Sequence, residues 1–437
     1  MSETQPSFRQ AAQVWAKIGL TSFGGPAGQI ALMHRELVED RRWISNERFL
    51  HALNYCMLLP GPEAQQLATY IGWTMFGVRG GLAAGGLFIL PGFIAIMLIS
   101  IAYASWGSLG ISSSILLGLK AAVLAIVVQA IVKLGKRALK TTVHLWIAAA
   151  AFAALALLSV PFPIVVLGAL ALGAVVLPRA TGLHTHDEQT RQEASAPPRR
   201  TARTLVICLA LWVLPLGLAL GLLGSRHVFV ELGVFFSKTA LVTFGGAYAV
   251  LGYVGVRAVD ERAWLTQREM VDGLGLAETT PGPLILVLQF VGFLAAYRNP
   301  GTLSPLMAGI LGATLTVWVT FVPSFTWIFV GAPYVERLRT STRIAAALEG
   351  VTASAVGVML NLSLWFGSHV LFSQHDAVQL GFLRLSVPSL ASLDLLVAGL
   401  ALGTGGLLLR TKLSVVKVLA LATLAGTFSS WLLGRLA

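Results

Sequence analysis

The stretch that decides the fold begins with Phe23-Gly24-Gly25 and ends with Pro60-Gly61-Pro62. The same order returns later in the chain, at the same spacing, as Phe244-Gly245-Gly246 and Pro281-Gly282-Pro283. This alignment, which we call the first register, also pairs Lys17 with Lys238, Arg41 with Arg262, and Trp43 with Trp264 without a gap. Further along, a second register pairs Pro91 with Pro323 and Gly118 with Gly350. So many matches in register indicate that the chain contains an internal duplication.

The rest of the sequence is apolar enough to cross a membrane many times. Of its 437 residues, 56% are hydrophobic and 11% are charged, whereas a soluble domain carries roughly 25% charged residues. A helix that spans the hydrocarbon core needs roughly 20 mainly apolar residues. Stretches that read as spanning are 82–106, 110–132, 143–159 with 161–178, 204–224, 303–331, 344–366, 391–409 and 413–433. The sequence therefore predicts an all-α polytopic membrane protein in contact with a lipid bilayer.

The formal net charge of +12 reflects topology rather than a nucleic-acid partner. The basic residues sit mostly in short connections between apolar runs, as expected for cytoplasmic loops. The two cysteines, Cys56 and Cys208, lie in unrelated segments and suggest neither a disulfide nor a metal site. His184 and His186 lie in a polar stretch, where a His-x-His pair is usually incidental. We expect no metal and no nucleic acid.

Polar composition divides the chain into parts. We expect a first transporter repeat over residues 1–178, a cytoplasmic linker over 179–203, a linking transmembrane helix over 204–224 and a second repeat over 225–437. Residues 179–203 form the one long polar stretch, whereas 204–224 has no counterpart in the first repeat.

Loop charges predict that the two repeats have opposite orientations. Lys133, Lys136, Arg137 and Lys140 follow the helix 110–132, whereas Arg337, Arg339 and Arg343 precede the matching helix 344–366. If both clusters are cytoplasmic, then equivalent helices run in opposite directions, and an odd helix must join the repeats. Six spans, one linking helix and six spans predict thirteen crossings with a cytoplasmic N-terminus. The four arginines between Arg35 and Arg48 would then fall on the outer side, so either this segment folds back or the count is wrong by one.

The duplicated motifs predict broken helices. Glycine pairs permit close backbone approach or a break, although small residues also serve ordinary helix packing in membranes. Two prolines around a glycine cannot continue a helix, so a helix over 46–59 should end there and a new one should start near residue 62. The start of the new helix presents free backbone N–H groups and a positive dipole end, which favour an anion. Inverted-repeat transporters place such breaks at a substrate site near the bilayer midplane.

We therefore predict that the substrate-binding residues cluster around the two breaks. They are Gly24, Gly25, Asn54, Pro60, Gly61, Pro62, Glu63, Gln65, Gln66, Lys120, Gly245, Gly246, Thr280, Pro281, Gly282 and Pro283. Polar residues near the first break outnumber those after the second, where Leu284 and Ile285 follow. Lys120 lies in the middle of an apolar helix, where a charge faces a water-filled path or a buried acidic partner.

Further candidates are Lys17, Lys238, Arg41, Arg262 and Glu278. A guanidinium suits a tetrahedral oxyanion, but arginine beside tryptophan also marks the membrane boundary. Acidic groups inside membranes often carry protons, so Glu63, Glu278 and Glu349 are candidates for proton coupling. The sequence holds no phosphate-binding loop and no hydrolase triad spacing. We expect a non-enzyme without catalytic residues or cofactor, driven by an ion gradient or by the membrane potential.

Together these residues resemble the chromate ion transporter family. The first half carries FGGPAGQIALM, VEDRRWIS, LLPGPEAQQLATYIGW and LPGF, and the second carries TFGGAYAVLGYV, DERAWLT and ETTPGPLILVLQFVGF. The resemblance covers nearly the whole chain apart from the linker and is closest to the long, two-domain members. It implies about thirteen helices in oppositely oriented halves, an inner-membrane location in bacteria, and export of chromate that confers chromate resistance.

Three alternatives stay open at this point. Sulfate is a tetrahedral dianion of similar size, so the protein could transport sulfate or another oxyanion. The same fold could form an anion channel, and a membrane-embedded chromate reductase is a further class, which the lack of a flavin or nicotinamide fingerprint disfavours. The sequence leaves the oligomeric state open, with a homodimer among the alternatives.

Overall fold

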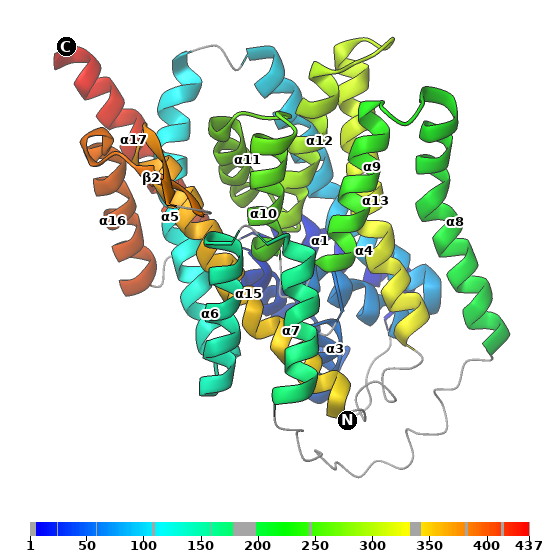
Figure 1. The fold of residues 1–437 in the computed structure, drawn as a ribbon. Helices are drawn as coiled ribbons and strands as arrows, with labels where there is room; N and C mark the ends of the chain where they lie inside the picture. Colours follow the sequence, from blue (N-terminus) through cyan, green and yellow to red (C-terminus); the bar gives the residue numbers. More distant parts are fainter. Residues whose placement is uncertain are drawn as a thin grey trace.

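The computed structural model describes residues 6–436 apart from 24, 58, 107–109, 159, 178–197, 244–246, 333–341, 381–382 and 412–414. Within these residues the fold is helical (Figure 1). The first part of the chain forms α1 (Phe8–Thr21), α2 (Gly25–His34), the π-helix η1 (Arg35–Asp40), α3 (Asn46–Cys56), α4 (Glu63–Trp106), α5 (Gly110–Ala138), α6 (Thr142–Ala156) and α7 (Phe162–Val176).

Helix α8 (Pro198–Leu223) leads into the second part of the chain. This part forms α9 (Val228–Val242), α10 (Ala247–Val256), the π-helix η3 (Arg257–Glu261), α11 (Gln267–Thr279), the short 3-10 helix η4 (Leu284–Leu286), α12 (Val287–Arg298), α13 (Pro305–Gly331), α15 (Thr342–Leu371), α16 (Leu395–Arg410) and α17 (Val415–Leu436).

Side-chain caps fix where the helices begin. The Ser7 hydroxyl accepts a hydrogen bond from the Gln10 N–H, and the Ser7 N–H donates to the Gln10 side-chain oxygen in return. Thr266 and Glu269 form the same capping box before α11. Ser45 caps α3 through the Arg48 N–H. Such caps satisfy backbone donors that the first helical turn leaves without partners. The short helices around the two duplicated motifs therefore have defined starts.

Helix α4 is a tight helical hairpin rather than one straight rod. At its turn, Phe76 and Gly77 leave the helical region, with φ of −138° and +63°. A Cβ built on Gly72 would lie 2.4 Å from the Gly80 oxygen, and one built on Gly80 would lie 2.1 Å from the Gly72 oxygen. The two arms of α4 therefore touch backbone to backbone, which only glycine permits.

By length and composition, five helical segments are long and apolar enough to cross a membrane, counted over the described residues, and the first of them contains the turn of α4. They are Glu63–Ser105, Leu117–Lys136, Thr201–Leu223, Pro305–Gly331 and Ala346–Leu371. The predicted spans 143–159 and 161–178 correspond to α6 and α7, which pack along α15. Each has 15 residues, fewer than the roughly 20 that a helix needs to cross the hydrocarbon core of a bilayer. The break between α6 and α7 falls at Pro161, which caps α7.

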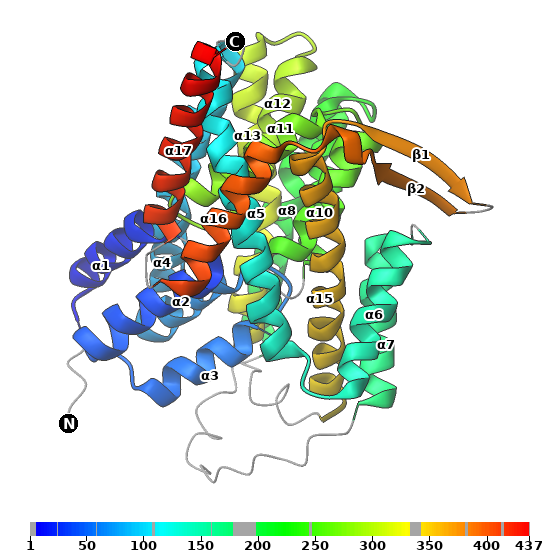
Figure 2. The same ribbon diagram turned by 90° about the vertical axis from the view of Figure 1, so that its left-hand side faces the viewer.

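Two details differ from the sequence-based expectation. Helix α8 begins at Pro198, inside the expected linker 179–203, because proline is well suited to the first helical turn. The expected fold is all-α, but β1 (His375–Leu380) and β2 (Leu383–Pro388) form an antiparallel hairpin after α15, with His375 opposite Pro388. A 3-10 turn, Leu390–Ser392, follows the hairpin. In Figure 2 the hairpin projects sideways from the helical body.

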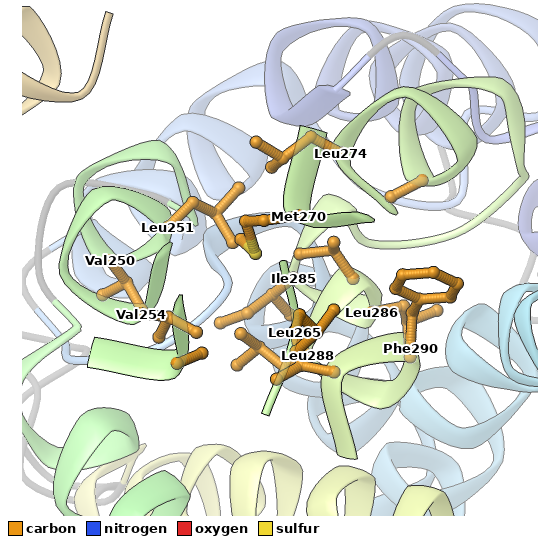
Figure 3. Packing of buried hydrophobic residues seen from close by; sticks show 14 of the residues in the cluster. Val250, Leu251, Val254, Leu265, Met270, Leu274, Ile285, Leu286, Leu288 and Phe290 are labelled. Carbon is orange, nitrogen blue, oxygen red and sulfur yellow. The ribbon is translucent and has the colours of Figure 1, made fainter. Parts of the chain in front are cut away.

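The early helices of the two parts lie toward opposite ends of the molecule. In both views α3 lies toward the lower end, whereas α11 and α12 lie toward the upper end. In Figure 2 α2 lies beside α3, so the arginine-rich segment between them folds back toward the lower end. A large hydrophobic core fills the upper region, where side chains of α10, α11, η4 and α12 converge (Figure 3).

Candidate functional site

Both Pro-Gly-Pro motifs lie between two helices. Helix α3 ends at Cys56 and α4 begins at Glu63, so Pro60-Gly61-Pro62 occupies the connection. Helix α11 ends at Thr279 and η4 begins at Leu284, with Pro281-Gly282-Pro283 between them. Gly61 has a φ of +131° and Gly282 a φ of +94°. These values lie in a region that residues with a Cβ rarely adopt, so each motif requires its glycine.

Each break is held by the end of a helix from the other part of the chain. The Gly61 N–H donates to the Thr243 carbonyl oxygen at 2.6 Å, and the Gly282 N–H donates to the Ser22 carbonyl oxygen at 2.9 Å. Ser22 and Thr243 are the C-terminal cap residues of α1 and α9. The first register pairs Ser22 with Thr243 as it pairs Gly61 with Gly282, so the two hydrogen bonds are reciprocal.

The breaks also pack against the long helices of the opposite part. A Cβ on Gly61 would lie 2.6 Å from the Ser324 hydroxyl oxygen on α13. A Cβ on Gly92, on α4, would lie 2.3 Å from the Pro281 carbonyl oxygen. Gly92 and Ser324 are equivalent in the second register, so this contact is reciprocal as well.

Buried amide side chains surround the breaks. Gln66 donates to the Pro60 carbonyl oxygen at 2.8 Å, and Gln65 donates to the Thr69 hydroxyl at 2.9 Å. Gln29 donates to the Gly282 carbonyl oxygen at 2.7 Å, which ties α2 to the second break. The three glutamine side chains and Thr69 are buried. The amides thus hold the backbone of both breaks.

Some buried polar atoms at this place have no hydrogen-bond partner among the described residues. They are the Ser22 hydroxyl and the carbonyl oxygens of Gln65 and Gln66. A buried polar atom left without a hydrogen bond is costly, so each such atom in a folded protein calls for a partner or a function. Gln65 and Gln66 follow the first break, whereas Ser22 lies at the second break, where its carbonyl oxygen accepts from the Gly282 N–H. Gln289, on α12 after the second break, has a buried carbonyl oxygen of the same kind.

The backbone donors of the two motif glycines are already used. The Gly61 and Gly282 N–H groups are not available to an anion, because they bind Thr243 and Ser22. The N–H groups of Ala64 and Gln65, in the first turn of α4, have no intrahelical acceptor, as in any helix start. The donors that can face an anion therefore lie one step further along, at the start of α4.

Lys17 and Arg41 converge on one buried carboxylate. Lys17 Nζ lies 2.6 Å from Glu36 Oε1, and Arg41 Nη1 lies 2.6 Å from Glu36 Oε2. Burial raises the pKa of the Glu36 carboxyl, but the Lys17 hydrogen bond and the charges of Arg41, Lys17 and Arg35 outweigh it, so the pKa lies below its ordinary value. The guanidinium of Arg41 also lies 5.6 Å from the Trp43 ring centroid.

The equivalent basic residues of the second half have different surroundings. Lys238 is exposed. Arg262 pairs with Glu231 at 3.0 Å and lies 4.9 Å from the Trp264 ring centroid. Both arginines of the first register thus rest on a tryptophan, while the lysines differ in their surroundings.

Lys120 pairs with an acid that the sequence argument did not identify. Its Nζ lies 2.8 Å from Asp272 Oδ1, and the Tyr103 hydroxyl donates to Asp272 Oδ2 at 2.8 Å. Asp272 is buried in α11, upstream of Thr280 at the break. The signal that could have found it is an acid inside the otherwise apolar run of α11.

The other predicted residues are placed as follows. Gly25 starts α2 with a φ of +73°, and the Thr280 hydroxyl donates to the Ala277 carbonyl oxygen. Glu63 begins α4, and Glu278 is buried near the end of α11. Glu349 lies on α15, 3.8 Å from His144. Gly24, Gly245, Gly246 and the side chain of Asn54 lie outside the described residues, as do His184, His186, Arg337 and Arg339.

Comparisons with known proteins agree over nearly the whole chain. The family described as chromate transporter matches residues 9–174 and 230–427. A chromate transport protein of Pseudomonas aeruginosa is 32% identical over 96% of this chain and 92% of its own length. A chromate transport protein of Cupriavidus metallidurans is 28% identical over 97% of this chain and 94% of its own length. A probable chromate transport protein of Synechococcus elongatus is 27% identical over 85% of this chain and 86% of its own length.

No solved structure matches the chain. The family match covers both halves that carry the duplicated motifs and leaves out residues 175–229, which include the whole of α8. Its extent, together with the long apolar helices, identifies the chain as a multi-pass membrane protein of the chromate transporter family.

Proposed function

We propose that this protein is a secondary active transporter that exports chromate from the cytoplasm and so confers chromate resistance. The substrate is supported by the relatives of Pseudomonas aeruginosa and Cupriavidus metallidurans, which carry the name chromate transport protein. The mechanism is supported by the structure of the two breaks, whose reciprocal hydrogen bonds from Gly61 and Gly282 are the observation that carries the proposal.

Two inverted repeats underlie this mechanism. Equivalent helices keep the first register, since α1, α2 and α3 correspond to α9, α10 and α11. Even the unusual backbone recurs, because Arg42 and Ala263 are non-glycine residues with positive φ at equivalent positions. The equivalent helices α3 and α11 lie toward opposite ends (Figures 1 and 2). Transporters of this plan rock one repeat against the other around a central site.

The lower end in Figure 1 is the cytoplasmic one in this proposal. Helix α5 ends, and α8 and α15 begin, toward this end. The basic residues at these helix ends are Lys133, Lys136, Arg199, Arg203 and Arg343. Lysine and arginine near the ends of spanning helices favour the cytoplasmic side, in line with a bacterial inner-membrane protein whose linker 179–203 is cytoplasmic.

The substrate site lies between the breaks, with the first half contributing most of the polar groups. The start of α4 supplies backbone donors and a positive dipole end, which stabilise an anion. The Ser22 hydroxyl, which has no partner among the described residues, adds a donor that an oxyanion can use. Gln65 and Gln66 hold the local structure through their amide nitrogens. The second break supplies a matching apolar wall from Leu284 to Leu286.

Flux measurements in everted membrane vesicles test this function. Vesicles containing the protein should accumulate chromate when a membrane potential is imposed, and vesicles lacking the protein should not. Excess sulfate should slow chromate uptake, because both are tetrahedral dianions. If purified protein in liposomes moves sulfate faster than chromate, the protein is a sulfate or general oxyanion transporter; if it moves neither, the proposal fails.

Electrical recordings separate the carrier from an anion channel. A carrier must change conformation for every ion, so single-molecule currents should be too small to resolve. Discrete single-channel steps in planar bilayers would contradict secondary active transport.

A further inference from the structure

The ion pair between Lys120 and Asp272 ties the two halves together. Asp272 belongs to α11 of the second half, whereas both of its partners, Lys120 on α5 and Tyr103 on α4, belong to the first half. Asp272 Oδ1 lies 2.8 Å from Lys120 Nζ in an ion pair without hydrogen-bond geometry, and Oδ2 accepts a hydrogen bond from the Tyr103 hydroxyl at 2.8 Å. Asp272 is 1% exposed and Lys120 is 18% exposed. Such a pair is costly to break, because breaking it leaves a charge buried without compensation.

Close packing surrounds this ion pair. A Cβ on Gly275, one turn further along α11, would lie 3.0 Å from Leu119 and 3.7 Å from Val123, both on α5. The Tyr103 ring meets the Phe290 ring edge to face, with centroids 5.2 Å apart. A Cβ on Gly273 would lie 2.6 Å from the same Phe290 ring. Glycines after Asp272 thus let α11 pack tightly against α5 and against the Phe290 ring on α12.

The equivalent place in the first half is built differently. In the two registers, Asp272 corresponds to His51 on α3 and Lys120 to Thr352 on α15, so the pair of opposite charges is not repeated. Leu50 on α3 is 45% exposed, whereas its equivalent on α11, Val271, is 1% exposed. Helix α11 packs against both α5 and α15, and α10 packs against α15. Among the described residues, the equivalent helices α2 and α3 make no comparable packing against α5 or α15.

We propose that Lys120, Asp272 and Tyr103 form an outer gate, and that this structure is closed at the end of α11 and open at the end of α3. Inverted repeats exchange two such arrangements during transport, so unequal packing of equivalent helices distinguishes the closed side from the open one. Transport then requires α11 to leave α5 and the ion pair to separate. Asp272 and Tyr103 are positioning residues, which act on access to the site and do not touch the anion. The assignment of this side as the outer one rests on the proposed function and its orientation.

A reporter cysteine tests the gate directly. Cys56 and Cys208 are first replaced by alanine, and Val123→Cys is introduced where α5 faces Gly275. Val123 is 1% exposed, so a membrane-impermeant maleimide added outside intact cells should label it slowly. Adding Asp272→Asn or Lys120→Met should raise the labelling rate about tenfold, which corresponds to about 1.4 kcal/mol in the closed–open equilibrium. Tyr103→Phe should raise the rate less, and Asp272→Glu should leave it near the starting value.

A second ion pair on α11 supplies the matched control. Arg298 on α12 pairs with Glu269 on α11 at 2.5 Å, so this pair joins two helices of the same half. Glu269→Gln should therefore leave the labelling of Val123→Cys unchanged. Equal labelling in the presence and absence of the Asp272→Asn substitution would overturn the gate, provided that size-exclusion chromatography shows the variant folded. If Asp272→Asn does not fold, the milder Tyr103→Phe variant decides, and an unchanged rate there also rejects the gate.

The gate and the proposed substrate fail in different ways. Labelling needs no chromate, so a faster reaction in Asp272→Asn supports the gate even if liposomes show no chromate flux. If the parent protein transports chromate but Asp272→Asn does not change the labelling rate, the gate is rejected and the proposed function stands. Asp272→Asn could instead speed labelling only in everted vesicles, where the maleimide reaches the cytoplasmic side. The ion pair would then be a gate on the cytoplasmic side, and its assignment to the outer side would be rejected.

Discussion

The two Pro-Gly-Pro breaks share a backbone but differ in chemistry. At both, a glycine with positive φ donates its N–H to the helix end of the opposite half. After the first break come Glu63, Gln65 and Gln66, whereas Leu284, Ile285 and Leu286 occupy the equivalent region of the second. A duplicated scaffold can therefore keep its mechanical contacts while the side chains directly after the break differ between the copies.

This difference predicts that the glycines matter in both halves but the side chains in only one. The backbone contacts belong to the scaffold, so breaking either should stop transport. The polar side chains directly after the break occur only in the first half. Substituting them should therefore slow transport, whereas substituting the equivalent apolar residues of the second half should not. Substitutions at the two breaks can test this division, beginning with the scaffold.

The largest effect is expected for Gly61→Leu, which should abolish chromate resistance and chromate flux. The new Cβ would lie 2.6 Å from Gln66 Nε2 and from the Ser324 hydroxyl oxygen. Strain from the backbone conformation adds roughly 1–3 kcal/mol. Gly282→Leu should be equally damaging, although its Cβ would meet Gly92 Cα only at 3.3 Å. Growth on chromate and vesicle uptake measure the loss.

Gly86→Leu is the matched control for both substitutions. Gly86 lies on α4, and a Cβ there would meet nothing within 4 Å. Resistance should stay close to that of the parent protein. Normal resistance in a well-expressed Gly61→Leu variant would remove the first break from the mechanism.

A smaller effect is expected for Gln66→Met. The substitution keeps the shape of the side chain but removes the donor to the Pro60 carbonyl oxygen. A buried acceptor left without its partner costs about 1–3 kcal/mol, so the initial rate of chromate uptake should fall about tenfold or more. Leu286→Met, at the position equivalent to Gln65, conserves volume and should cost less than about 1.5 kcal/mol. Equal losses in both variants would contradict the functional asymmetry of the breaks.

Glu36→Gln should lower stability more than Glu231→Gln does. The Glu36 side chain is 3% exposed and holds both Lys17 and Arg41, whereas Glu231 is 41% exposed and holds Arg262. An exposed pair contributes below about 1 kcal/mol, and loss of a buried carboxylate leaves its partners uncompensated. The melting temperature of the detergent-solubilised protein, followed by tryptophan fluorescence, measures the difference.

The same carboxylate predicts how stability responds to acid. The pKa of Glu36 lies below its ordinary value of 4.5, because its positive partners outweigh the effect of burial. Its contribution is therefore fully present above pH 4.5 and is lost as the pH falls through the lowered pKa. The gap in melting temperature between the parent protein and Glu36→Gln should narrow only below pH 4.5. A gap that closes at neutral pH would contradict this assignment.

The sequence was informative wherever the backbone itself repeats. The first register located both breaks, and the predicted helix 46–59 ends in the structure at Cys56, with the next helix starting at Glu63. Glycine and proline impose these features locally, so no tertiary information is needed. The hairpin within α4 was not predicted, although Gly77 and the run Arg79-Gly80-Gly81 interrupt the apolar sequence at its turn.

Contacts between the halves could not be predicted from the sequence. Lys120 calls for an acidic partner, but the choice of Asp272 depends on how α11 packs against α5. The hydrogen bond from the Gly61 N–H to the Thr243 carbonyl oxygen also depends on tertiary packing. The local sequence shows only that this N–H has no acceptor within its own helix. The polar-to-apolar contrast after the two breaks was visible in the sequence, but the Gln66 hydrogen bond was not.

The smallest effect is expected for deleting residues 184–197 from the linker, which should leave chromate resistance largely intact. The family match ends at residue 174 and resumes at residue 230, so nothing that this match covers lies in the deleted segment. The deletion stops short of α8, which lies entirely outside the match but makes specific contacts. Trp318 on α13 donates to the Leu211 carbonyl oxygen at 2.7 Å, and Trp212 donates to Ser237 on α9 at 3.1 Å. In the proposed inverted-repeat arrangement α8 is the crossing that reverses the second half, so removing α8 as well should abolish resistance. Growth on chromate compares the two deletions, and similar resistance in both would mean that α8 does not set the orientation of the second half.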